Sequence, residues 1–91
     1  MKLFLNANLI IDELIDNAVV SSNQNSEISI LNSTALYLLN NCNNLSVDEL
    51  IIKFISELDD FSGKSHDEIY DECKDAIEKM IEDKLIVVKG K

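Results

Sequence analysis

The spacing of the apolar residues changes near residue 32, and this change constrains the fold more than any other feature of the sequence. Before residue 32, apolar residues occur in short runs separated by Asn, Asp and Ser, over residues 9–14, 17–21 and 27–31. Runs of this length are typical of strands, and Asn and Asp tolerate the left-handed backbone of the tight turns that we expect at residues 15–17 and 23–26. This part of the chain predicts a three-stranded antiparallel meander.

Three helices are expected after the meander, because the apolar residues there recur at helical spacing. The first covers about residues 34–40 and begins at a cap formed by Asn32 or Ser33. The second and third extend to about residues 58 and 83, and each begins at a capping box, a Ser followed three residues later by Glu. The two boxes are Ser46 with Glu49 and Ser65 with Glu68. A loop at residues 59–64 separates these helices, and residues 85–88 form a short closing strand or an extended tail.

The helices must cover the apolar face of the meander, which predicts an α+β fold. With 91 residues, the chain is shorter than the roughly 100 to 200 residues of a typical domain. A second independent core is not expected in a chain of this length. We therefore expect a single domain over residues 1–91.

The charge balance argues against several partners. Eight Lys and no Arg against 17 Asp plus Glu give a net charge of −9, and an acidic surface repels both nucleic acid and anionic membranes. A winged-helix DNA-binding protein remains the runner-up by shape alone, but its reading helix, residues 67–83, would carry eight acids against two Lys. An acyl carrier protein has similar size and acidity, yet neither Ser46 nor Ser65 follows the Asp of an Asp-Ser-Leu attachment motif.

No segment has the roughly 18 consecutive apolar residues of a membrane span, and the N-terminus lacks the apolar region of a signal peptide. We expect a soluble, cytoplasmic protein that does not associate with a membrane.

The residues that catalysis would need are scarce, so we expect a binding module and no enzyme. There is one histidine, His66, and there are only two glycines, with no Gly-rich phosphate loop. Cys42 and Cys73 lie too far apart for a Cys-x-x-Cys motif, and no cofactor or metal is expected. We interpret Cys73 as a small core residue, Cys42 as partly exposed, and His66 as solvated.

The third helix has a lopsided apolar surface. A core stripe is formed by Ile69, Cys73, Ala76, Ile77, Met80 and Lys84. Tyr70 and Ile81 lie further round on one side with Lys74 just beyond them, whereas the opposite shoulder carries Glu72, Lys79 and Asp83. Two interpretations remain open. The stripe is a wide core contact, or Tyr70, Ile77 and Ile81 line a groove in which an edge strand and the helix receive an extended peptide.

Several segments in order resemble the PqqD-like family, the precursor peptide recognition elements of ribosomally made, post-translationally modified peptides. They are Leu31-Asn32-Ser33-Thr34-Ala35, Leu38-Leu39, Ser46-Val47-Asp48-Glu49-Leu50, Ile69 with Cys73, Ala76-Ile77, Met80-Ile81 and Leu85-Ile86. Glu72 occupies the acidic position of the family's last helix, and the resemblance covers about residues 5–88. Lys84 departs from a frequent Gly of the family, and Asn43-Asn44 departs from a common Asp-Gly turn.

The resemblance implies a small winged-helix-like domain that binds a precursor's leader peptide by strand addition and presents it to a modifying enzyme, such as a radical SAM protein. It implies a peptide chaperone with no catalysis of its own, and we expect a monomer when free. The implied leader-binding residues are Glu27, Ile28, Ser29, Ile30 and Leu31 on the third strand, with Tyr70, Lys74, Ile77 and Ile81 on the third helix. A winged-helix DNA-binding or protein-interaction adaptor is the alternative.

Overall fold

The computed structural model describes residues 1–15, 17–22, 25–58 and 63–90, with the backbone alone at residues 22 and 25–27. Its elements in chain order are β1 (Lys2–Leu5), β2 (Leu9–Glu13), β3 (Asn17–Ser22), β4 (Asn25–Asn32), α1 (Ser33–Asn41), α2 (Val47–Ser56), α3 (His66–Glu82) and β5 (Ile86–Lys89). Residue 16, residues 23–24 and residues 59–62, which belong to the two expected turns and the expected loop, lie outside the described residues.

The predicted meander is present as an antiparallel sheet in the order β2-β3-β4. Its inner face carries Ala18 and Val20 from β3, which are fully buried, and Leu31 from β4, which pairs with Ala18. This alternation matches the period of a half-buried sheet, with one face on the core and the other toward solvent. The three-stranded sheet and the three helices confirm the α+β fold.

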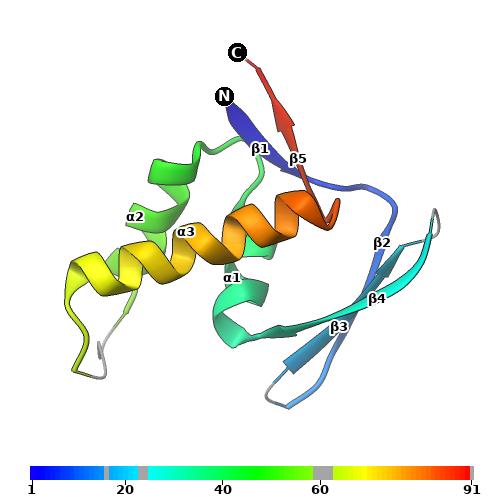
Figure 1. Cartoon of the computed structure of the whole chain (residues 1–91), viewed down its shortest axis with the longest axis horizontal. Helices are drawn as coiled ribbons and strands as arrows, with labels where there is room; N and C mark the ends of the chain where they lie inside the picture. Colours follow the sequence, from blue (N-terminus) through cyan, green and yellow to red (C-terminus); the bar gives the residue numbers. More distant parts are fainter. Residues whose placement is uncertain (16, 23–24, 59–62, 91) are drawn as a thin grey trace.

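A second, two-stranded sheet was not predicted. β1 and β5 pair antiparallel from Lys2↔Lys89 to Leu5↔Ile86, so the two ends of the described chain lie side by side (Figure 1). The closing strand was one of two possibilities for residues 85–88, but β1 was missed altogether. It is a four-residue strand whose partner lies at the far end of the chain, and local periodicity does not report such a pairing.

The helix starts follow the sequence signals. The Asn32 side chain, and not that of Ser33, caps α1 by accepting the backbone N–H of Ala35 at 2.9 Å. Both predicted capping boxes are formed, at Ser46 with Glu49 and at Ser65 with Glu68. Each cap fixes the residue at which its helix begins. The Asn32 cap also fixes the junction between β4 and α1.

α3 ends in a Schellman motif that turns the chain into β5. The backbone N–H of Leu85 donates to the carbonyl of Met80 at 2.8 Å, and that of Lys84 donates to the carbonyl of Ile81 at 3.1 Å. These bonds require a left-handed residue between helix and strand. Lys84 occupies it with φ 68°, a conformation that glycine adopts with less strain.

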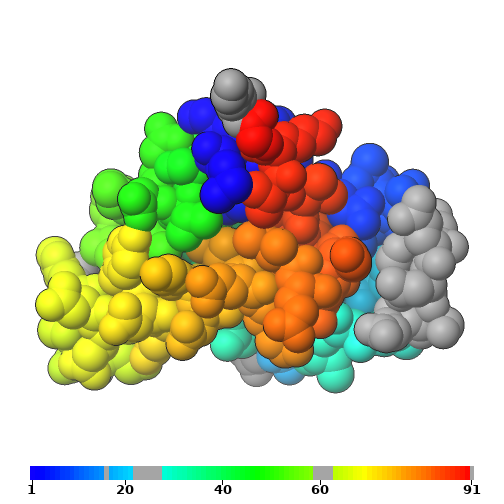
Figure 2. Space-filling model, turned by 45° about the horizontal axis from the view of Figure 1, so that its top comes forward, coloured from blue at the N-terminus to red at the C-terminus, as the bar shows by residue number. Residues whose placement is uncertain are grey.

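One hydrophobic cluster joins all three helices to both sheets among the described residues. Leu38, Leu39 and Ile77 are fully buried in it, and Tyr37 packs its ring against Phe54 at a centroid distance of 5.3 Å. Cys42 is also fully buried, so our interpretation of this residue as partly exposed is wrong. The polar residues around Cys42 suggested an exposed break, but Cys42 belongs to the same core cluster as Leu3 of β1, whose backbone exchanges hydrogen bonds with Leu45 and Asn44. α3 crosses the molecule between the two sheets, and one long side of it stays on the surface (Figure 2).

Candidate functional site

β4 is an edge strand of the three-stranded sheet. It pairs with β3 along one side, and no described strand pairs with its other side. Edge strands are usually protected by charged residues or proline. β2, at the opposite edge, ends in Asp12-Glu13, whereas residues 28–31 of β4 carry no charge. This stretch of β4 is therefore free of the devices that prevent another strand from pairing.

A groove of about 690 Å³ lies along this edge. Its first wall is β4 together with the first turn of α1, and its second wall is one side of α3. β4 and the C-terminal half of α3 run beside each other in opposite senses (Figure 1). The lining residues of α3 are Glu72, Asp75, Ala76, Lys79, Met80 and Asp83. The groove is long and open, which suits an extended chain better than a compact small molecule.

The groove has an apolar floor. Leu31, Ala35 and Met80 belong to the buried core and also line the groove, and Ala76 is half-buried beside them. On the other face of β4, Ile28 and Ile30 are 66% and 72% exposed. An added strand would find apolar contacts on both of its faces, because its side chains alternate in the same way as those of β4.

Charged side chains form the rim. Glu72 accepts two hydrogen bonds from the Lys64 ammonium at 3.0 and 2.7 Å, and this pairing raises the pKa of Lys64. The Nζ atom of Lys79 lies 3.5 Å from Oδ2 of Asp83. Asp75 has no ion-pair partner among the residues that the structure describes. Of the three carboxylates at the rim, Asp75 alone forms no ion pair in the described part of the chain.

The predicted strand residues lie at the groove, and the predicted helix residues do not. Ile28, Ser29, Ile30 and Leu31 line it, and the backbone of Glu27 belongs to the same strand, although its side chain is not described. Tyr70 and Lys74 instead line a second hollow of about 320 Å³ on the other side of α3. This hollow is completed by Met1, Ser46, Val47, Asp48 and Glu78.

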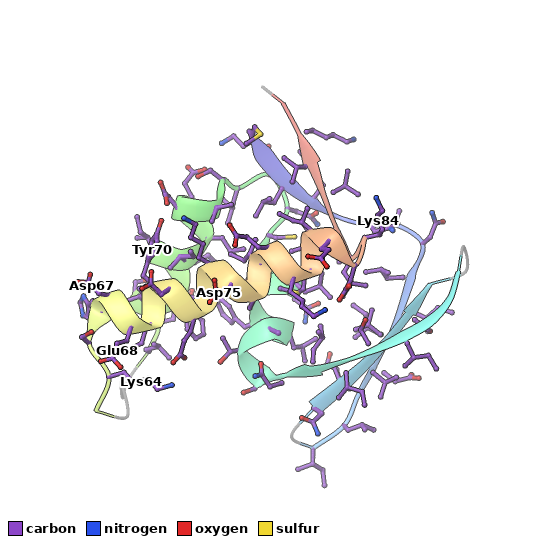
Figure 3. All side chains as sticks on the ribbon, in the orientation of Figure 1. Lys64, Asp67, Glu68, Tyr70, Asp75 and Lys84 are labelled. Carbon is purple, nitrogen blue, oxygen red and sulfur yellow. The ribbon has the colours of Figure 1, made fainter. Side chains whose placement is uncertain are left out.

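Within the second hollow, the Tyr70 hydroxyl donates a hydrogen bond to the Asp48 carboxylate. This bond, with partial burial, raises the pKa of the Tyr70 phenol and ties α3 to the start of α2. Figure 3 shows Tyr70 on the α2 side of the helix, while Asp75 lies on a different side. Ile77 is fully buried and Ile81 is half-buried against the core, so neither is a groove wall.

The correction concerns which shoulder of α3 faces β4. The helical spacing of the residues separates the two shoulders of α3 correctly. Both shoulders flank the same core stripe, however, and the spacing does not show which of them faces β4. The structure places the shoulder with Glu72, Lys79 and Asp83 beside β4. Because α1 begins directly after β4, the side of α3 that meets the first turn of α1 also meets β4, but only the structure shows which side this is.

The two cysteines are buried thiols. Burial raises the pKa of the Cys42 and Cys73 thiols to about 11 each, which keeps both thiols protonated at neutral pH. Within residues 1–15, 17–22, 25–58 and 63–90, no group of three or more His, Cys, Asp or Glu is arranged to hold a metal ion. None of the described helices is long and apolar enough to cross a membrane.

The fold and the groove define a small α+β domain with an open strand edge beside a helix. No family model matches the chain, and no curated protein matches its sequence. Among solved structures, the chain is similar to TbiB1 in complex with the TbiA(beta) leader peptide. The TM-score is 0.71, the sequence identity is 11%, and the alignment covers 100% of both chains. The whole chain thus has the fold of TbiB1.

Proposed function

We propose that this protein is a peptide-recognition domain of the PqqD-like kind, which binds the leader region of a ribosomally made precursor peptide and presents it to a modifying enzyme. The observation that carries the proposal is the edge of β4 that no described strand pairs with, beside a groove on α3. The shared fold with TbiB1, which was solved with a leader peptide, and the resemblance of the sequence segments support it.

The groove explains how such a leader would bind. Backbone N–H and C=O groups of β4 supply hydrogen bonds to an added strand, and every second side chain of that strand enters the groove over Ala76 and Met80. The proposed contacts on β4 are residues 27–31. Because each backbone bond contributes only about 1 kcal/mol net and the peptide must become ordered, we expect affinities near the micromolar range.

Tyr70 and Lys74 form a separate part of the proposal, since they lie in the second hollow. A leader contact there would require a peptide that extends beyond the groove. Ile77 and Ile81 would then act only through the packing that holds α3 in place.

The proposal includes a cytoplasmic, monomeric domain without catalytic activity, and it covers residues 1–91 as one unit. The alternative, a DNA-binding winged helix, shares the shape, but its reading helix would be α3, whose acidic residues repel a phosphate backbone. The enzyme that receives the peptide, a radical SAM protein or another class, is left to experiment.

The proposal is tested by titrating ¹⁵N-labelled protein with the synthetic leader of a precursor peptide encoded beside its gene. We expect the largest shifts at the backbone amides of Ile28, Ser29 and Ile30, with slower hydrogen exchange there on binding. Shifts confined to α2, with β4 unchanged, would place the peptide elsewhere and contradict strand addition.

A further inference from the structure

We propose that the groove selects peptides with a Lys or Arg two positions from an apolar anchor, and that Asp75 sets this charge preference. The inference rests on the proposed function and specifies the chemistry of the peptide that the groove takes. It follows from two properties of the groove: the ion pairing of its charged rim, and the distance between Asp75 and Met80 along α3.

The rim charge is negative and unevenly compensated. Glu72, Asp75 and Asp83 line the groove against Lys79 as the single described cation in its lining. Lys64 already pairs with Glu72, and Lys79 lies beside Asp83. Asp75 is exposed, and Lys79, one helical turn further along α3, pairs with Asp83 and not with Asp75, so the Asp75 carboxylate is available to a cation that the peptide brings.

The distance between Asp75 and Met80 along α3 determines where in the peptide that cation must lie. Met80 lies five residues after Asp75 on α3, which is about 7.5 Å along the axis at about 1.5 Å per residue. Successive side chains on one face of a strand are about 6.6 Å apart, at about 3.3 Å per residue. An apolar side chain seated over Met80 therefore brings the side chain two positions away to the level of Asp75. Both side chains point from the added strand toward α3, because residues two apart share a face.

An acidic residue at that position would be disfavoured. It would face Asp75 with Glu72 and Asp83 nearby, and like charges brought together at an interface oppose binding. To gain a cation it would have to displace an existing partner, either Lys64 from Glu72 or Lys79 from Asp83. The groove therefore discriminates by repelling anionic strands as well as by attracting cationic ones.

The experiment selects binders from a displayed library of random 12-residue peptides on the immobilised, full-length protein. The amides of Ile28 and Ile30 then report whether an enriched, synthesised peptide binds at β4. We expect enriched peptides to carry Lys or Arg two positions from an aliphatic or aromatic residue. Selection on the Asp75→Lys variant should shift the enrichment to Asp or Glu, and the control variant Asp67→Lys, which changes an exposed acid of α3 outside the groove and two turns away from Asp75, should not.

Affinity measurements on one enriched peptide isolate the contribution of the ion pair between Asp75 and the peptide's cation. Asp75→Asn should weaken binding about two- to fivefold, the range of a partly solvated ion pair. Replacing the peptide's cation by Gln should weaken binding to the unchanged protein by the same factor and have no further effect in Asp75→Asn. Asp71→Asn should leave the affinity unchanged. Circular dichroism checks that each variant keeps its helices.

The outcomes separate the two proposals. Enriched peptides that shift β4 amides but show no charge preference, or an acidic one, would overturn the role of Asp75 and leave strand addition in place. Enriched peptides that leave β4 amides unchanged would overturn the proposed function, and this inference with it.

Discussion

At the scale of single residues, Leu39 and Tyr70 distinguish stability from binding. Leu39 is fully buried at the centre of the core, whereas Tyr70 is half-buried at the second hollow. We expect Leu39→Ala to lower the free energy of unfolding by about 2 to 5 kcal/mol, because it leaves a cavity in packed surroundings. The fold of Tyr70→Ala should survive, and its affinity for the leader should fall by more than about 1 kcal/mol if the leader reaches the hollow.

Chemical denaturation and calorimetric titration measure these two quantities side by side. A Tyr70→Phe variant serves as control, because it keeps the ring and removes only the bond to Asp48. Equal losses of stability in Leu39→Ala and Tyr70→Ala, with unchanged leader affinity in the latter, would make Tyr70 purely a core residue.

The two thiols give a prediction about pH. Burial raises the pKa of Cys42 and Cys73 from about 9 to about 11, so the folded state holds these protons more tightly than the unfolded state. The stability that this difference contributes is complete below pH 9 and is lost as the pH rises toward 11. We expect the free energy of unfolding to fall over this window, and to fall less in Cys73→Ala than in the unchanged protein when both are measured by urea denaturation.

A second measurement at pH 8 checks the same burial. A thiol-specific reagent should label the two cysteines of the folded protein slowly and those of the urea-unfolded protein at once. Rapid labelling of the folded protein would show that the thiols are accessible and would contradict the raised pKa values.

At the scale of elements, the sequence predicts whatever is locally encoded. The capping boxes at Ser46 and Ser65 placed the starts of α2 and α3 correctly, since each motif is a local exchange of hydrogen bonds. The meander was likewise predicted from its short runs. The β1–β5 pairing and the inward turn of Cys42 depend on contacts between distant segments, and four residues of β1 carry too little pattern to reveal them.

The turn after α3 gives a prediction at this scale. Lys84 adopts φ 68° where a side chain costs about 1 to 2 kcal/mol, and glycine recovers this at the cost of greater freedom in the unfolded chain. Lys84→Gly should therefore raise the free energy of unfolding by up to about 1 kcal/mol. The matched control Lys74→Gly, in the helix interior, should lower it by about 1 kcal/mol. Thermal unfolding of both variants measures the difference, and destabilisation by both would argue against the strained turn.

At the scale of the whole molecule, the strand side of the groove could be predicted from the sequence, and the helix side could not. An edge strand can be inferred from a meander, and residues 28–31 of that strand do line the groove. The side of α3 that faces this edge depends on how the helix crosses the sheet, which is set by packing of the entire core. The groove residues Asp75, Ala76 and Met80 were therefore found only in the structure, although all three lie on a helix whose limits the sequence predicted.

The last prediction concerns how the whole domain acts on a partner enzyme. A domain that holds the leader in the groove and contacts the enzyme raises the local concentration of the core peptide at the enzyme's active site, without chemistry of its own. Adding this protein should therefore lower the concentration of leader-bearing precursor needed for half-maximal modification, and leave the rate for a leader-less core peptide unchanged. Mass spectrometry of the modified peptide measures both. A variant with Ala76→Glu, which places a charge at a half-buried position of the groove floor, should lose most of the effect, while Asp71→Asn should keep it, provided both remain helical. If the protein alone changed the mass of the peptide, or accelerated the leader-less substrate equally, presentation would be wrong and a catalytic or allosteric role would be required.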